Sequence, residues 1–136
     1  KRYNIYILMQ IGLIIFSVVF SVLAGISKAI CDLSEEGKIK FYKKTFWIKD
    51  LSWQNKWKNG DKKQGEKFWL SSRQLVWITD AWHLFGVLFR TTFAKAYICV
   101  GLLISINIWY AFASIVVYII FATTFHIFYT YKIFRK

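Results

Sequence analysis

The sequence predicts an all-α membrane protein with three transmembrane helices and a basic, aromatic-rich interfacial loop between the first and the second. Of its 136 residues, 57% are hydrophobic and 21% are aromatic, whereas soluble domains are roughly 45–50% apolar. The excess falls in two long runs without a formal charge, which is the pattern of membrane-spanning helices. Residues 1–136 are long enough for a single membrane domain.

Residues 5–27 form the first predicted span. These 23 residues carry no charge, and about 20 apolar residues cross a hydrocarbon layer of ~30 Å as a helix. A cleaved signal peptide also has an apolar stretch behind basic residues such as Lys1 and Arg2, but that stretch is shorter. We therefore expect a retained span.

Residues 28–78 form a polar and interfacial segment in which lysines alternate with aromatic residues. Aromatic rings favour the headgroup level, and lysines extend outward from it. We expect the segment to lie on the membrane surface, and the alternative is a small folded cap that docks on a partner protein. The residues expected at the lipid headgroups are Lys43, Lys44, Trp47, Trp53, Trp57, Lys58, Trp69 and Arg73.

The second and third spans are predicted at residues 79–106 and 110–131. Residues 96–131 carry no formal charge and would measure about 54 Å as one helix, which is too long for one span and too short for two. The second span must therefore start before this run, and we expect the turn near residues 107–113.

An amphipathic helix is expected to lead into the second span. If the chain is wound as an α-helix from Arg73 to Lys95, its ionisable residues fall within about 140° of arc. This stripe would face water, headgroups or protein rather than lipid tails. Its members are Arg73, Asp80, His83, Arg90 and Lys95.

The distribution of basic residues predicts the orientation. With three spans, the long loop and the C-terminus share one side, which takes 17 of the 19 basic residues when Lys1 and Arg2 are assigned to the other side. Because basic loops remain in the cytoplasm, we place the loop and the C-terminus there. The basic residues that give the chain its net charge of +12 flank the apolar runs. We therefore expect the chain to bind anionic lipid headgroups and not nucleic acid.

The candidate polar or ligand site consists of Asp80, His83, His126 and Asp32, which the three-span topology places at a similar depth. An ionisable group at membrane depth is usually paired or functional. We favour a structural role, in which His83 hydrogen-bonds Asp80, and we predict no cofactor. The alternatives are a metal held by Asp80, His83 and His126, a haem between the two histidines, or a proton or quinone site.

Three short stretches resemble a pattern found in small uncharacterised bacterial integral-membrane proteins. They are SWQNKWKNGD at residues 52–61, GEKF at residues 65–68 and TDAWHL at residues 79–84. The resemblance covers roughly residues 52–85. It implies a bacterial inner-membrane location and no particular activity.

The sequence contains no GxGxxG, Walker, HExxH or GxSxG motif. We therefore expect a small accessory or interaction subunit of a larger membrane complex, without catalysis of its own. Its partner would be another membrane protein or a second copy of the chain. The main alternative is a redox or proton-handling protein built on Asp80, His83 and His126, and the third is a lipid-modifying enzyme.

Overall fold

Three long helices dominate the computed structural model of the protein, which describes residues 2–41, 44–131 and 133–134. They are α1 (Arg2–Glu35), α4 (Ala81–Ile106) and α5 (Phe112–Thr130). All three are long and apolar enough to cross a membrane, and the described part of the chain contains no β-strand. The prediction of an all-α chain with three long apolar helices is confirmed.

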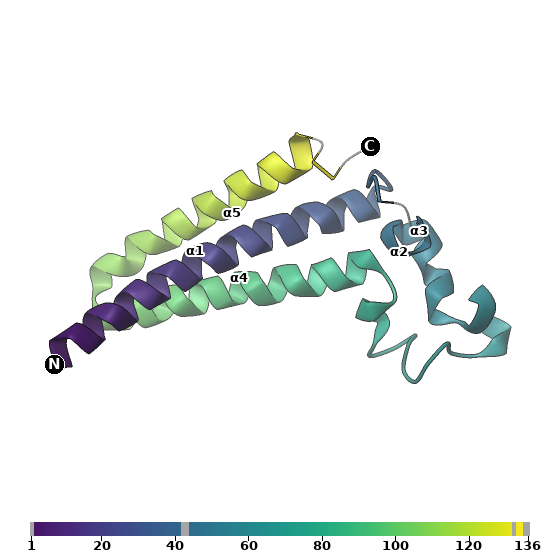
Figure 1. The fold of residues 1–136 in the computed structure, drawn as a ribbon, viewed down its shortest axis with the longest axis horizontal. Helices are drawn as coiled ribbons and strands as arrows, with labels where there is room; N and C mark the ends of the chain where they lie inside the picture. The colour runs from purple at the N-terminus through teal and green to yellow at the C-terminus, as the bar shows by residue number, and fades with distance from the viewer. Residues whose placement is uncertain (1, 42–43, 132, 135–136) are drawn as a thin grey trace.

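The helices form one layer with α1 in the middle, α4 along one side and α5 along the other (Figure 1). Helix α4 runs antiparallel to α1, and α5 runs parallel to it (Figure 1). The N-terminus therefore lies at the same end as η5 (Ile108–Ala111), the turn between α4 and α5. The segment between α1 and α4 and the end of α5 lie together at the opposite end (Figure 1).

Small residues on α1 allow this close packing. Its buried positions include Ser17, Ser21 and Ala24, and small side chains let helix backbones approach each other in membranes. The approach is closest at Gly25, where an added Cβ would lie 2.8 Å from the Cβ of Thr124 and 2.9 Å from the carbonyl oxygen of Phe121. Both atoms belong to α5, so Gly25 sets the distance between α1 and α5.

Helix α1 continues eight residues beyond the predicted end of the first span, from Ser27 to Glu35. These residues belong to the predicted polar segment, so that segment begins later than predicted. The helix persists because Lys28 pairs with Asp32 one turn later at 2.5 Å, an i,i+4 arrangement that supports helices. Ile30 and Leu33 on the same stretch are buried in a hydrophobic cluster.

The predicted amphipathic helix from Arg73 to Lys95 is wrong in its first part. Residues 70–75 form turns, η4 (Val76–Ile78) follows, and α4 starts only at Ala81. Leu70 has a left-handed φ of 58°, and Asp80 has an extended backbone with φ −152° and ψ 153°. Because the Asp80 carboxylate accepts the first-turn N–H of His83, it caps a helix that begins directly after it.

Residues 36–41 and 44–80, hereafter the cap, form a folded unit rather than an extended loop. Short helices and turns succeed one another in it: α2 (Lys44–Trp47), α3 (Lys49–Ser52), η1 (Trp53–Lys56), η2 (Lys58–Gly60), η3 (Lys62–Gln64) and η4. The cap is joined to the helices by an apolar cluster in which Phe41, Trp47, Phe85 and Phe134 pack around buried Ile39. The backbone N–H of Lys40 also donates to the carbonyl of Phe134 at 2.9 Å.

Candidate functional site

Asp80 and His83 form a buried pair at the start of α4. Asp80 is only 1% exposed, and its carboxylate accepts the backbone N–H of His83 at 2.7 Å. The imidazole Nδ1 of His83 lies 2.7 Å from the second carboxylate oxygen. The Thr79 hydroxyl donates to the Val76 carbonyl at 2.6 Å, and its oxygen lies 3.4 Å from the same carboxylate oxygen. The carboxylate is thus held by His83, and hydrogen bonding of this kind stabilises a buried acid.

A second polar group links α1, α3 and α4 beside this pair. The Lys49 ammonium lies 2.5 Å from the Glu35 carboxylate and 4.2 Å from the centre of the Trp82 ring. The indole N–H of Trp82 donates to the other oxygen of Glu35 at 3.3 Å. The carbonyl of Trp82 in turn accepts from the thiol of Cys31 at 3.5 Å. These contacts fix the start of α4 against the end of α1.

The other two residues of the predicted polar site do not join Asp80 and His83. Asp32 pairs with Lys28 on its own helix. His126 is exposed on α5, with its Nδ1 3.3 Å from the Thr130 hydroxyl. Within the described residues, no three His, Cys, Asp or Glu side chains come together as metal ligands. Asp80 and His83 therefore contact each other, whereas the contact that His126 makes is with Thr130 on its own helix.

The predicted headgroup residues divide into inward and outward sets. Trp47 points inward, with its ring 4.4 Å from Phe41 and 5.8 Å from Phe85. Lys62 lies 5.9 Å above the ring of Trp57, which is partly covered. The outward set consists of Trp53, Lys58, Trp69 and Arg73. Lys44 begins α2, and Lys43 lies outside the described residues.

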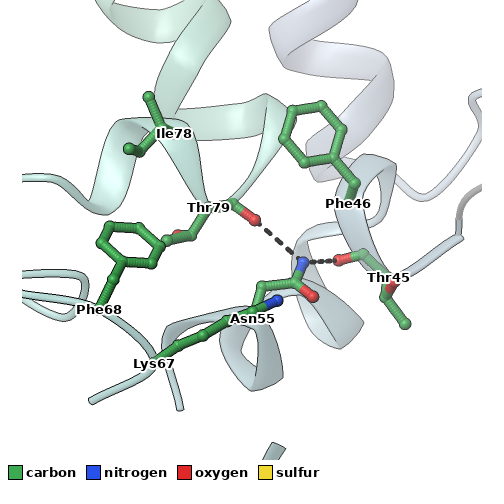
Figure 2. Close-up of a pocket in the computed structure, with 7 residues that line it drawn as sticks. All are labelled: Thr45, Phe46, Asn55, Lys67, Phe68, Ile78 and Thr79. Carbon is green, nitrogen blue, oxygen red and sulfur yellow. Dashed lines mark hydrogen bonds between the residues drawn. The ribbon is translucent and has the colours of Figure 1, made fainter. Parts of the chain in front are cut away.

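A pocket of about 470 Å³ opens in the cap next to the start of α4. Its lining residues are Thr45, Phe46, Asn55, Lys67, Phe68, Ile78 and Thr79. Figure 2 shows the amide nitrogen of Asn55 donating to two carbonyls, that of Thr45 at 2.7 Å and that of Thr79 at 2.9 Å. Asn55 therefore holds η1 against both α2 and the residue that precedes Asp80.

The three stretches that carry the resemblance meet at this pocket. Asn55 belongs to the first stretch, Lys67 and Phe68 to the second and Thr79 to the third. A smaller pocket of about 300 Å³ also includes Asn55 and Lys67 in its lining. Asn55 is not among the predicted site residues, because an asparagine between two tryptophans gives no indication of which carbonyls it will meet.

Glu66 holds the turn that presents Phe68 and Trp69. Its carboxylate accepts from the hydroxyl and the backbone N–H of Ser72, and from the backbone N–H of Leu70 at 3.0 Å. The hydrogen bond from the Ser72 hydroxyl is the main reason why the pKa of Glu66 lies below its ordinary value of 4.5. Glu66 is therefore an ionised structural anchor at neutral pH.

Comparison of the chain with known protein families, with curated proteins and with solved structures finds no match.

Proposed function

We propose that the chain is a small accessory subunit of a bacterial inner-membrane complex. In this proposal the cap lies in the cytoplasm and binds a partner protein, and the chain catalyses no reaction of its own. The observation that carries the proposal is an ordered cap with large apolar side chains on its outside.

We use the name outer aromatic surface for five exposed large apolar side chains of the cap: Trp53, Phe68, Trp69, Trp77 and Ile78. Each of them is between 37% and 79% exposed. Aromatic residues are enriched at protein interfaces and often supply most of the binding energy. Apolar side chains of this size on an ordered scaffold are therefore a reason to expect a partner.

The scaffold beneath this surface is held by hydrogen bonds. The Ser71 hydroxyl donates to the carbonyl of Lys56 at 2.7 Å, and the backbone N–H groups of Lys58 and Lys67 bridge the two sides of the same turn. Together with the Asn55 bridge, these bonds fix the surface before binding. Preorganisation reduces the entropy lost on association and so favours affinity.

The basic residues of the cap support the cytoplasmic location and a second contact. Lysines and arginines concentrate on the cytoplasmic side of membrane proteins, and each one near an anionic leaflet contributes about 1 kcal/mol of attraction, screened by salt. Lys58 and Arg73 are exposed. We therefore expect anionic headgroups at the rim of the cap and protein at its outer aromatic surface.

Photo-cross-linking in growing cells tests the proposal. A benzophenone side chain at Phe68 should cross-link to one discrete membrane protein. The alteration Trp69→Ala should reduce that product at least about tenfold, since truncation of a tryptophan hot spot costs about 2 kcal/mol or more and tenfold corresponds to about 1.4 kcal/mol. The matched control is Trp109→Ala, which removes a tryptophan of similar exposure, 72% against 79%, at the other end of the molecule. Cross-links to lipid alone, or equal products from both variants, would refute the proposal.

A further inference from the structure

Lys95 lies in the middle of α4 without an acidic partner among the described residues. It is 14 residues after Ala81 and 11 before Ile106, or about 21 Å and about 17 Å from the two ends of the helix. Its ammonium lies over the ring of Phe20 at 5.7 Å, and that aromatic ring on α1 is its charge-stabilising contact. A cation at the centre of a spanning helix costs roughly 2.5–3.5 kcal/mol on insertion scales.

The side chain of Lys95 stays at the depth of its own backbone. Lys28 on α1 lies over Phe89 on α4, and because these helices are antiparallel, Phe20 is level with the residues just after Lys95. The ammonium is thus not carried toward the cap. Arg90 behaves differently, because its guanidinium lies 3.8 Å from where a Cβ on Gly86 would be, one turn nearer the cap. Arg90 can therefore reach toward the headgroups, and Lys95 does not.

The depth of Lys95 also follows from α5. Ala96, the residue directly after Lys95, packs in one cluster with Val117. Val117 lies near the middle of the apolar span Ile108–Thr130. Lys95 is therefore close to the midplane by the positions of both α4 and α5. The headgroup layer on either side is about 15 Å away, half the hydrocarbon thickness.

The face of α4 that carries Lys95 has the spacing of a helix-packing seam. Its exposed residues recur at alternating intervals of three and four: Leu88, Thr91, Lys95, Ile98, Leu102 and Ser105. The three large apolar members are between 38% and 61% exposed, so this face is only partly covered, although the Lys95 ammonium reaches Phe20 on α1. Residues at such intervals line up along one side of a helix and pack against a second helix at a shallow angle.

We propose that this seam binds a transmembrane helix of a different protein and that Lys95 pairs with an Asp or Glu of that helix near the midplane. The proposal rests on the proposed role as an accessory subunit and adds a contact inside the membrane. A second copy of the chain cannot provide the carboxylate, because all seven acidic residues lie between Asp32 and Asp80, at or beyond the cap end. An acidic partner helix would neutralise Lys95 where lipid cannot.

The test uses the full chain in phosphatidylcholine vesicles with a synthetic polyleucine transmembrane peptide. Association is measured by energy transfer for four peptides, with Asp, Asn, Leu or Lys at the central position. The wild-type protein should bind the Asp peptide about tenfold more tightly than the Leu peptide, near the upper range of polar contacts between membrane helices. Lys95→Met should remove this preference, and the matched variant Arg90→Met should retain it. In the charge swap, Lys95→Asp should prefer a peptide with a central lysine.

Equal binding of the Asp and Leu peptides by the wild-type protein, or an Asp preference that persists in Lys95→Met, would overturn the inference. So would loss of the preference on adding phosphatidylglycerol, because Lys95 would then serve an anionic lipid. If Lys95→Met does not fold, Lys95→Gln takes its place. If the Asp preference is absent while the cross-link from Phe68 persists, only this inference fails. If the Asp preference is present while the cross-link from Phe68 is absent, the contact at Lys95 stands and the proposed docking role of the cap is refuted.

Discussion

Asp80→Ala is expected to lower the free energy of unfolding by about 2–3 kcal/mol. The change removes the N-cap side chain of α4, which contributes about 1 kcal/mol. It also leaves the backbone N–H and the imidazole of His83 without their shared acceptor, which costs a further 1–2 kcal/mol or so. The carboxylate is 1% exposed, so water cannot easily replace it. Reversible unfolding in mixed detergent micelles, followed by circular dichroism, measures the difference.

Two further variants distinguish this role from a general effect of removing an acid. Asp80→Asn should cost only about 1 kcal/mol, because the amide oxygen still caps the helix. Asp61→Ala also removes a capping side chain, which accepts the N–H of Lys63 at 2.9 Å, but it lies in an exposed turn and should change the stability by less than about 0.5 kcal/mol. Equal losses for Asp80→Ala and Asp61→Ala would show that burial of the Asp80 carboxylate contributes nothing.

Gly25→Ala is expected to lower the free energy of unfolding by a similar amount, about 2–3 kcal/mol. The new methyl group would lie 2.9 Å from the Phe121 carbonyl oxygen and 3.0 Å from the Phe125 backbone nitrogen. Backbone atoms cannot rotate away as a side chain can, so α5 must shift as a whole, and overpacking of this kind typically costs 1–3 kcal/mol or so. The same unfolding measurement gives the result.

Gly12→Ala is the matched control, since it makes the same chemical change in the same helix. No heavy atom lies within 4 Å of its added Cβ, and alanine is favoured over glycine in a helix by up to about 1 kcal/mol. Gly12→Ala should therefore leave the stability unchanged or raise it slightly. A Gly25→Ala protein as stable as Gly12→Ala would mean that α5 is not closely packed on α1.

The number of long helices was predictable from the sequence because charge is excluded from lipid-facing runs. Residues 5–27 and 96–131 are uncharged for that reason, and their lengths alone require a third span that starts earlier. The helix ends were harder to predict. The charges of Lys28 and Asp32 indicate that the apolar span has ended and that a polar loop begins. The two residues instead form an ion pair across one helical turn, and α1 continues to Glu35.

The cap shows the limit of periodic patterns. Its residues are arranged by individual hydrogen bonds, such as the two from Asn55 to Thr45 and Thr79, which have no signature in residue spacing. The Asp80–His83 pair was predicted from a spacing of three along one helix, but it forms because Asp80 is the N-cap of α4 and His83 lies in the first turn of that helix. The position of His126 was not, because depth along the membrane does not determine which side of α5 a residue occupies.

The side of the membrane that carries the cap is measured most directly by labelling single cysteines in intact cells. In a background with Cys31→Ala and Cys99→Ala, an impermeant maleimide should leave Asn59→Cys and Lys136→Cys unlabelled until the membrane is permeabilised. Trp109→Cys, in the turn between α4 and α5, should react from outside without permeabilisation. Labelling of Asn59→Cys in intact cells, with Trp109→Cys protected, would place the cap outside the cytoplasm and contradict a cytoplasmic docking role.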